Sequence, residues 1–536
     1  YVAKGDGTLT VKATKRNVVD SETDKENLQG KQWVYGGMRM GGRSYYALDL
    51  TDIDSPKVKF HIDPNSGRVY SADKAAGTHY SALENMGQSW SKPRLDYVNW
   101  KGQRKLVMFI GGGYDAGGTD GNGLFDAQGR RTGFAGYEYY NYKQAQKSCA
   151  TKADGSVDLT CSTGKKGSGV YMFDADNGDL LWYADSNTAS ATTGVEHLSS
   201  TDLKYSVVSE IKTIDRNGDG VVDHLYFGDL AGQAFRVDFK NDSVGFDSQM
   251  TKVLNLHKTN GTSPRFYMSP TFTAHHGGTK LEGGDIVVAA FVSGNKSSPL
   301  LATVDSLETT GLRSSSNLEY DAVYAIYDYD IHPDRTGGYP VLADQLAART
   351  LAASATAHVS PTQLKLIEST AKTSATVTGA AISKTSGWGG WYYPFKQTFA
   401  KANENAAVIK GITPLVAMDG GLYVTMYDAS NAGTSSGCGA GVKGHSFAKR
   451  LCLPTGVCAQ DVDYTWNLGS GIINLNVGPT GGGKSIIVPD KEDICTGETC
   501  SPCVGVDCKK GEVFPKVNTS IYFTPKRWFE RYAKAD

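Results

Sequence analysis

The sequence predicts an all-β fold, a β-propeller of six to eight blades with long insertions at its rim. Glycine and tyrosine are both abundant, at 63 and 29 of 536 residues, and turn residues separate the extended stretches. This composition is typical of folds built from many short strands. The second observation is a repeated pair of strands that recurs along the chain.

The repeated unit is a strand that ends in a glycine turn, followed by an aromatic-rich alternating strand that ends in aspartate. Five units are found: residues 35–37 with 41–49, 105–113 with 170–174, 225–229 with 233–238, 285–291 with 323–328, and 413–421 with 422–428. Sheets repeated in this way close radially, so that each blade buries its faces against its neighbours. Residues 176–182 are expected to supply the tight turn and outer strand of one blade. The irregular intervals do not fit a WD40 array.

One large domain is predicted over residues 1–489, with insertions at about 114–169, 331–387 and 429–461. The second insertion begins with a predicted short helix after Pro340. Residues 490–536 are expected to form a cysteine-rich tail packed on the propeller. Because the chain begins at Tyr1, without a methionine or a signal peptide, we expect it to be part of a longer precursor.

The overall charge excludes two classes of partner. Lys and Arg number 55 against 56 Asp and Glu, which leaves a net charge of -1. Nothing therefore draws the whole molecule to nucleic acid or to an anionic membrane. No run approaches 18 apolar residues, so no membrane span is predicted.

The nine cysteines fall into three groups in loop-like or closely spaced settings. They are Cys149 and Cys161; Cys438, Cys452 and Cys458; and Cys495, Cys500, Cys503 and Cys508. Paired spacing of this kind predicts disulfides and an oxidising compartment, with one cysteine left over. The last group could hold tetrahedral zinc instead of forming two local disulfides.

The clearest motif lies at residues 215–223. Oxygen-bearing side chains stand at positions 1, 3, 5 and 9, a glycine stands at position 6, and position 7 offers its carbonyl. Calcium takes six to eight hard oxygen ligands, and a loop with ligands at every second residue needs glycine at its sharp bend. The predicted Ca²⁺ ligands are Asp215, Asn217, Asp219, the carbonyl of Val221, and Asp223.

The flanks of this loop predict strands on both sides. Residues 207–214 and 221–227 are rich in β-branched or aromatic residues and lack a helical stripe. Position 12, which is a bidentate glutamate in an EF-hand, is Tyr226. The loop therefore belongs between strands. Ordinary Asn-Gly and Asp-Gly hairpin turns, with no metal, are the alternative reading.

Several of these segments resemble the C-terminal domain of the PilY1/PilC family, calcium-binding adhesins at the tip of bacterial type IV pili. The matching words are residues 41–49, 109–115, 215–233, 323–328 and 390–392. They occur in the right order and reach from about Trp33 to about Cys458. Each segment alone is weak evidence for the resemblance, but the five segments together are specific to the family.

The resemblance implies a modified propeller similar to quinoprotein dehydrogenases, with a calcium site at the five positions named above. It implies an extracellular protein at the pilus tip and outer surface of a Gram-negative bacterium. The implied partners are minor pilins and a host-cell receptor or abiotic surface. The implied role is pilus assembly and attachment, with calcium occupancy opposing retraction. The alternative is a calcium-stabilised adhesive or scaffolding propeller with no part in pilus dynamics.

No enzyme is predicted. Quinone-dependent dehydrogenases as a family hold their cofactor between a tryptophan and two adjacent cysteines, and no two cysteines are adjacent here. No Ser/His/Asp set or carboxylate pair stands out, and likeness of fold does not carry function. The dehydrogenase reading remains the weakest of the alternatives.

Other constellations favour ordinary structural roles. Residues 478–485 match the phosphate-loop pattern, but the β-branched run that follows predicts a glycine-rich hairpin or loop and not a helix. His275 and His276 would point to opposite faces of a strand. Polar loop residues are also the default for two possible ion sites: Asp115 with Asp120 and Asp126, and Asp328 with Asp330 and His332.

Overall fold

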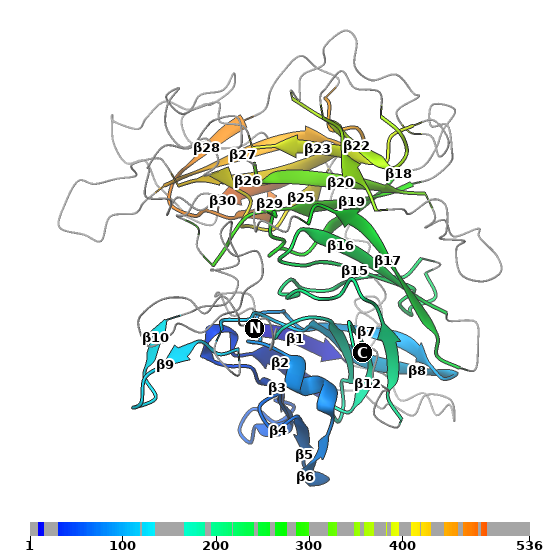
Figure 1. Ribbon diagram of the computed structural model, residues 1–536, viewed down its shortest axis with the longest axis vertical. Helices are drawn as coiled ribbons and strands as arrows, with labels where there is room; N and C mark the ends of the chain where they lie inside the picture. The colour runs from blue at the N-terminus through cyan, green and yellow to red at the C-terminus, as the bar shows by residue number, and fades with distance from the viewer. Residues whose placement is uncertain are drawn as a thin grey trace.

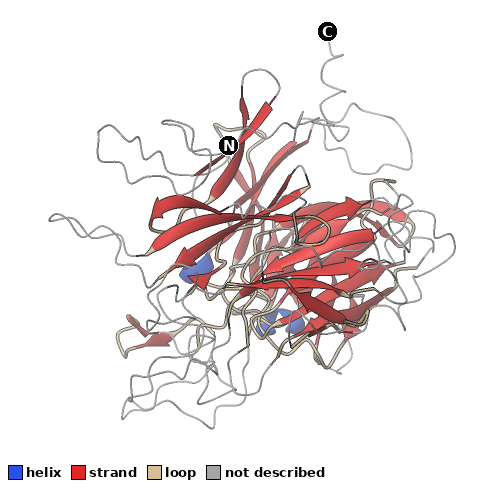
Figure 2. Cartoon of the chain, turned by 90° about the horizontal axis from the view of Figure 1, so that it is seen from above, coloured by secondary structure: helices blue, strands red, loops and turns tan. Residues whose placement is uncertain are grey.

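The computed structural model describes a little over half of the chain, almost all of it β-strand and turn (Figure 2). The described ranges are 9–14, 31–117, 121–133, 166–187, 194–216, 218–240, 245–257, 263–275, 286–297, 299, 320–329, 348–353, 359–368, 382, 387–395, 409–418, 420–429, 444–458, 465–480 and 484–489. For residues 9–14, 124–125, 131–133 and 476–489 this covers the backbone alone. The predicted helix after Pro340 lies outside these ranges.

Blade 1 is a six-stranded antiparallel sheet in chain order. Its strands are β1 (Leu9–Thr14), β2 (Lys31–Gly37), β3 (Tyr45–Asp49), β4 (Lys57–Asp63), β5 (Arg68–Ser71) and β6 (Lys74–His79). Two short 3-10 helices adjoin it, η1 (Arg39–Gly41) and η2 (Ser81–Asn85).

Blade 2 has five strands in the order β13-β12-β11-β8-β7. They are β7 (Arg94–Trp100), β8 (Gln103–Gly111), β11 (Val170–Asp174), β12 (Leu180–Asp185) and β13 (Glu196–Ser199). Residues 176–182 were expected to supply the tight turn and outer strand of a blade. The prediction of the outer strand is wrong, because residues 180–182 belong to β12 and the parallel strand β13 lies outside it. A separate hairpin, β9 (Leu124–Phe125) with β10 (Arg131–Gly133), lies in the first predicted insertion.

Blade 3 is an antiparallel four-stranded sheet in chain order. Its strands are β14 (Lys212–Ile214), β15 (His224–Gly228), β16 (Gln233–Phe239) and β17 (Ser248–Asn255). The strand expected over residues 207–214 is thus limited to its last three residues.

Blades 4 and 5 complete the series. Blade 4 has the order β18-β19-β20-β23-β22-β21, and blade 5 has β24-β26-β27-β28 with β25 also paired to β26. The strands of blade 4 are β18 (Thr271–His275), β19 (Ile286–Val292), β20 (Ala322–Asp328), β21 (Thr350–Leu351), β22 (Gln363–Leu366) and β23 (Gly390–Pro394). Those of blade 5 are β24 (Ile409–Lys410), β25 (Val416–Met418), β26 (Gly421–Asp428), β27 (His445–Cys452) and β28 (Thr465–Ser470).

Stretches predicted as insertions contribute to these two blades. β21 and β22 come from 331–387, and β27 comes from 429–461. β29 (Leu475–Thr480) and β30 (Lys484–Pro489) pair antiparallel on either side of residues 481–483, which confirms the hairpin predicted near residue 480.

Successive blades pack face to face in chain order (Figure 1). One apolar core joins blades 1 and 2, the next joins blades 2 and 3, and two more join blade 3 to 4 and blade 4 to 5. Because an apolar cluster lies on each face of blades 3, 4 and 5, strands β15, β16, β19, β20 and β26 are buried along their whole length. The predicted all-β propeller class is confirmed, with five blades in the described part.

Candidate metal centre

The loop between β14 and β15 contains the sequence-predicted calcium ligands. β14 and β15 pair antiparallel, with Ile214 opposite His224, so residues 215–223 form the connection of a hairpin in blade 3. The prediction that the loop joins two strands is confirmed. Asn217 lies outside the described residues.

Hydrogen bonds within the loop turn two of the carboxylates inward. Asp215 accepts the amide of Gly218 on Oδ1 at 2.7 Å and that of Gly220 on Oδ2 at 2.8 Å. Asp223 accepts the amide of Arg216 on Oδ2, at 2.7 Å, from across the loop. Carboxylates that take backbone N–H groups in this way close a tight turn on itself.

The remaining predicted ligands lie on the second half of the loop. Asp219 accepts the amide of Val221 at 2.8 Å. Gly220 has φ +89°, a left-handed conformation that side-chain-bearing residues rarely adopt, which is the physical reason for glycine at position 6. Position 6 of the motif is therefore glycine because the backbone bends sharply there, as the spacing of the motif predicts.

The donor chemistry fits a hard divalent cation, since Asp215, Asp219 and Asp223 offer only oxygen. Within the described part of the chain, however, no three His, Cys, Asp or Glu side chains come together closely enough to hold a metal ion. The carboxylates are held by amides of their own loop. Binding would require them to draw together.

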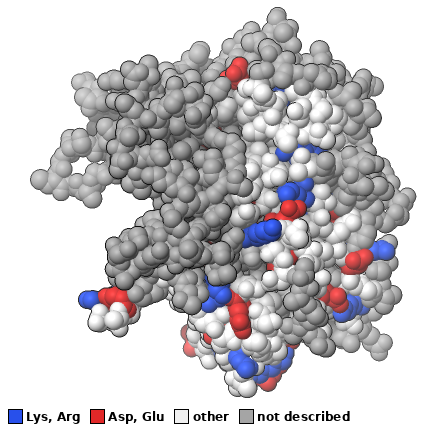
Figure 3. Space-filling view, in the orientation of Figure 1, with Lys and Arg blue, Asp and Glu red and all other residues white. Residues whose placement is uncertain are grey.

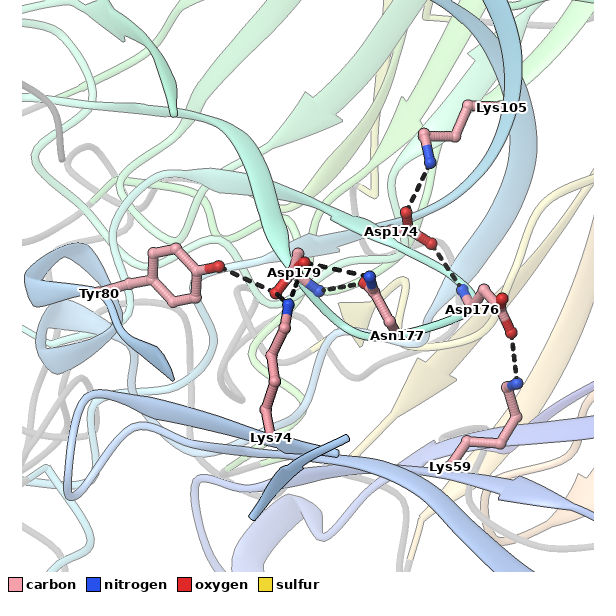
Figure 4. A network of polar contacts seen from close by, with 8 residues as sticks. All are labelled: Lys59, Lys74, Tyr80, Lys105, Asp174, Asp176, Asn177 and Asp179. Carbon is pink, nitrogen blue, oxygen red and sulfur yellow. Dashed lines mark hydrogen bonds and ion pairs between the residues drawn. The ribbon is translucent and has the colours of Figure 1, made fainter. Parts of the chain in front are cut away.

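A second acidic turn, after β11, shows what a loop neutralised by the protein itself looks like (Figure 4). Lys105 pairs with Asp174 at 2.7 Å, Lys59 with Asp176 at 2.5 Å, and Lys74 with Asp179 at 2.5 Å. Tyr80 also donates to Asp179, at 3.1 Å. Two of the three lysines come from blade 1 and bridge to blade 2. The contacts given above for the carboxylates of the loop at 215–223 are with backbone amides of the same loop.

The strands that follow the loop carry a buried ionic network that sequence reasoning missed. His224 Nδ1 lies 2.5 Å from Asp238, and Arg236 lies 2.8 Å from Asp238 and 2.7 Å from Asp328 of blade 4. Each of these side chains is at most 2% exposed. Charged residues inside the apolar strand 233–239 were the available signal.

Tyr226 completes this network by donating its hydroxyl to Asp328. Burial, and then the charge of Asp328, raises the pKa of Tyr226 well above its usual value, so the hydroxyl keeps its proton. The carboxylate of Asp328 is therefore bound inside the junction of blades 3 and 4. Asp330 and His332, its predicted companions at an ion site, are outside the described residues.

The other sequence-predicted sites have structural partners. Asp115 is fully buried and accepts the amides of Gly117 and Lys166, whereas Asp126 pairs with Arg130. Asp120 is not described. His275 lies 2.9 Å from the hydroxyl of Thr273, and His276 is not described.

One disulfide is described, between Cys452 and Cys458. The loop that it closes packs against Trp391, whose indole N–H donates to the carbonyl of Pro454 at 2.6 Å. A Cβ on Gly456 would lie 3.0 Å from the same indole ring. The other predicted cysteine partners lie outside the described residues.

On the face drawn in Figure 3, the described acidic and basic side chains lie among one another. No helix in the described part is long and apolar enough to cross a membrane.

Comparison with solved structures finds several likenesses at low sequence identity. The crystal structure of the Pseudomonas aeruginosa PilY1 C-terminal domain is 13% identical, with a TM-score of 0.46 over 86% of this chain and 79% of that chain. A europium-containing methanol dehydrogenase is 9% identical, with a TM-score of 0.28 over 85% and 72%. A Bacteroides ovatus xyloglucan-locus GH43B protein is 9% identical, with a TM-score of 0.19 over 86% and 87%.

Searches by sequence found no counterpart. No protein-family model matches the chain, and no curated protein matches it significantly.

Proposed function

We propose that this chain is a calcium-binding propeller domain of a type IV pilus-tip adhesin, in which the loop at 215–223 holds one Ca²⁺. The observation that carries the proposal is the loop itself: four oxygen side chains at alternating positions, with a left-handed glycine at the sixth. The resemblance of the neighbouring sequence segments to the PilY1/PilC family supports the assignment to a pilus-tip adhesin. In that setting the protein lies outside the cell, at the pilus tip and outer surface of a Gram-negative bacterium.

Calcium would act on the loop by cancelling the mutual repulsion of three carboxylates. Asp215, Asp219 and Asp223 stand within nine residues, and Asp223 is almost fully buried. Carboxylates at such spacing repel one another, and burial strengthens that repulsion. Occupancy would therefore stiffen the start of β15.

The proposed consequence is control of the pilus. With calcium bound, the domain supports pilus extension through contacts with minor pilins, and it contributes to attachment at a host-cell receptor or an abiotic surface. Without calcium, retraction prevails.

Substitution of Asp219 tests the metal. Asp219→Ala removes one carboxylate but leaves the apolar strands intact, so the domain folds and binds Ca²⁺ at least about tenfold more weakly by titration calorimetry. Asp52→Ala is the matched control, because Asp52 also accepts an amide two residues on, in an exposed turn of blade 1. Equal calcium affinity in wild type and Asp219→Ala would remove the loop as the binding site.

The same variant in cells tests the biology. We expect fewer surface pili and reduced twitching with Asp219→Ala and no change with Asp52→Ala. Weakened calcium binding with unaltered motility would favour an adhesive or scaffolding propeller that takes no part in pilus dynamics.

A further inference from the structure

The second half of the calcium loop is held by the neighbouring blade. The amide of Val222 donates to the carbonyl of Tyr97 on β7, at 2.8 Å. The carbonyl of Gly220 accepts from Arg104 Nη2 on β8, at 3.3 Å. The hairpin β7–β8 of blade 2 therefore contacts the backbone on both sides of Val221.

These two contacts orient the carbonyl of Val221, the one predicted backbone ligand. In a trans peptide the C=O of one residue and the N–H of the next point in opposite directions. Because the N–H of Val222 points to Tyr97, the carbonyl of Val221 points away from blade 2. The preceding peptide is held on both sides as well, since Val221 N–H bonds to Asp219 and Gly220 C=O bonds to Arg104.

Arg104 is itself placed by two neighbours. Its guanidinium lies over the ring of Tyr97, 4.1 Å from the centroid. Its Nη2 also lies 3.0 Å from where a Cβ on Gly220 would stand. Because Gly220 has no side chain, the guanidinium of Arg104 has room to reach the carbonyl of Gly220.

We propose that Arg104, supported by Tyr97, is a positioning residue for the calcium site, so that calcium affinity depends on a blade that supplies no ligand. This inference rests on the proposed function of the loop. It assigns Arg104 a role opposite to the one its charge would give, because a nearby cation by itself repels Ca²⁺.

The sign of the effect makes the proposal testable. Calcium titration calorimetry is carried out on the wild type, Arg104→Met and Arg104→Lys. Positioning predicts that both variants bind about threefold to tenfold more weakly, since each loses the forked donor that reaches Gly220. Charge alone predicts tighter binding in Arg104→Met and unchanged binding in Arg104→Lys, and either of these results would overturn the proposal.

The control is Lys101→Met. Lys101 carries the same charge on the same hairpin, and its described contacts are with Trp100 and Glu196. Its removal is expected to leave calcium affinity within about twofold of wild type. If Lys101→Met lost as much calcium affinity as Arg104→Met, the effect would come from the charge or the folding of the hairpin, and the proposal would be overturned.

A second readout needs no calcium. Amide hydrogen exchange at Val222 in the calcium-free protein is expected to quicken in Arg104→Met, because the hairpin holds that amide less firmly. Failure of the two proposals is distinguishable: wild type that binds no calcium overturns the metal site and this role with it. Calcium binding with unaltered affinity and exchange in Arg104→Met overturns this role alone.

Discussion

Asp229 is a fully buried carboxylate at the turn between β15 and β16. It accepts the amides of Ala231 and Gln233, at 2.9 and 2.8 Å. Burial nevertheless raises the pKa of Asp229 from 3.8 to about 7. The charge of Asp202 raises it further, while the two amides and Lys252 oppose the shift.

The raised pKa predicts a pH-dependent stability. Because the folded state holds the proton more tightly than the unfolded chain, this contribution is full below about pH 4 and is lost as the pH rises to about 7. The loss is roughly 4 kcal/mol at most. Asp229→Asn keeps an oxygen for the amides and removes the titration.

Calorimetric unfolding of wild type and Asp229→Asn between pH 4 and 8 measures this directly. We expect the wild type to lose stability relative to the variant over that range. A constant difference in melting temperature across the range would show that Asp229 does not titrate there.

The site residues that the sequence could predict are those that lie close to one another in the chain. Asp215, Asp219 and Asp223 are ligand candidates because of spacing within nine residues, and Gly220 follows from the same spacing. Arg104 contacts Gly220 from 116 residues away. No periodicity or motif relates such positions, so this partner was visible only once the blades were packed.

Among the elements, β15, β16 and β20 are joined by the ionic network at the junction of blades 3 and 4. Breaking a buried pair is costly because it leaves a charge without its partner. Arg236 has two carboxylate partners, and Tyr226 adds a hydroxyl to one of them. The network thus ties β15, the strand that follows the loop at 215–223, to the next blade.

Tyr226→Phe removes only the hydroxyl. We expect a loss of about 1.5–3 kcal/mol in the free energy of unfolding, since the hydroxyl donates to a charged group. Tyr45→Phe is the control, because Tyr45 is equally buried but donates to a neutral carbonyl, that of Ser91, at 3.0 Å. It should cost about 1 kcal/mol. Urea unfolding that ranks Tyr226→Phe at or below Tyr45→Phe would contradict a role for this network in joining the blades.

The elements themselves were predictable to different degrees. In each of the five repeated units the two strands are antiparallel neighbours, as with β19 and β20 or β15 and β16. Their long apolar runs or aromatic alternation identified them. The parallel strands β13, β21 and β22 were missed, because they are short and carry no apolar run.

For the whole molecule, packing of blades in chain order places the loop at 215–223 of blade 3 against the β7–β8 hairpin of blade 2. Its flanking strand contacts blade 2 as well, since Thr213 donates to Asp96 at 2.8 Å and accepts from Arg94 at 3.0 Å. The fold class followed from repetition, which does not depend on distant contacts. The position of the loop at a blade junction followed only from the three-dimensional packing.

Hydrogen exchange across the whole chain, with and without calcium, tests the central claim most directly. If one Ca²⁺ binds at 215–223, added protection should concentrate in peptides covering residues 212–228 and the β7–β8 hairpin at 94–111. The acidic turn at 174–179 should be unaffected, because lysines already neutralise it. No protection at 212–228, or protection centred on 174–179, would contradict the account.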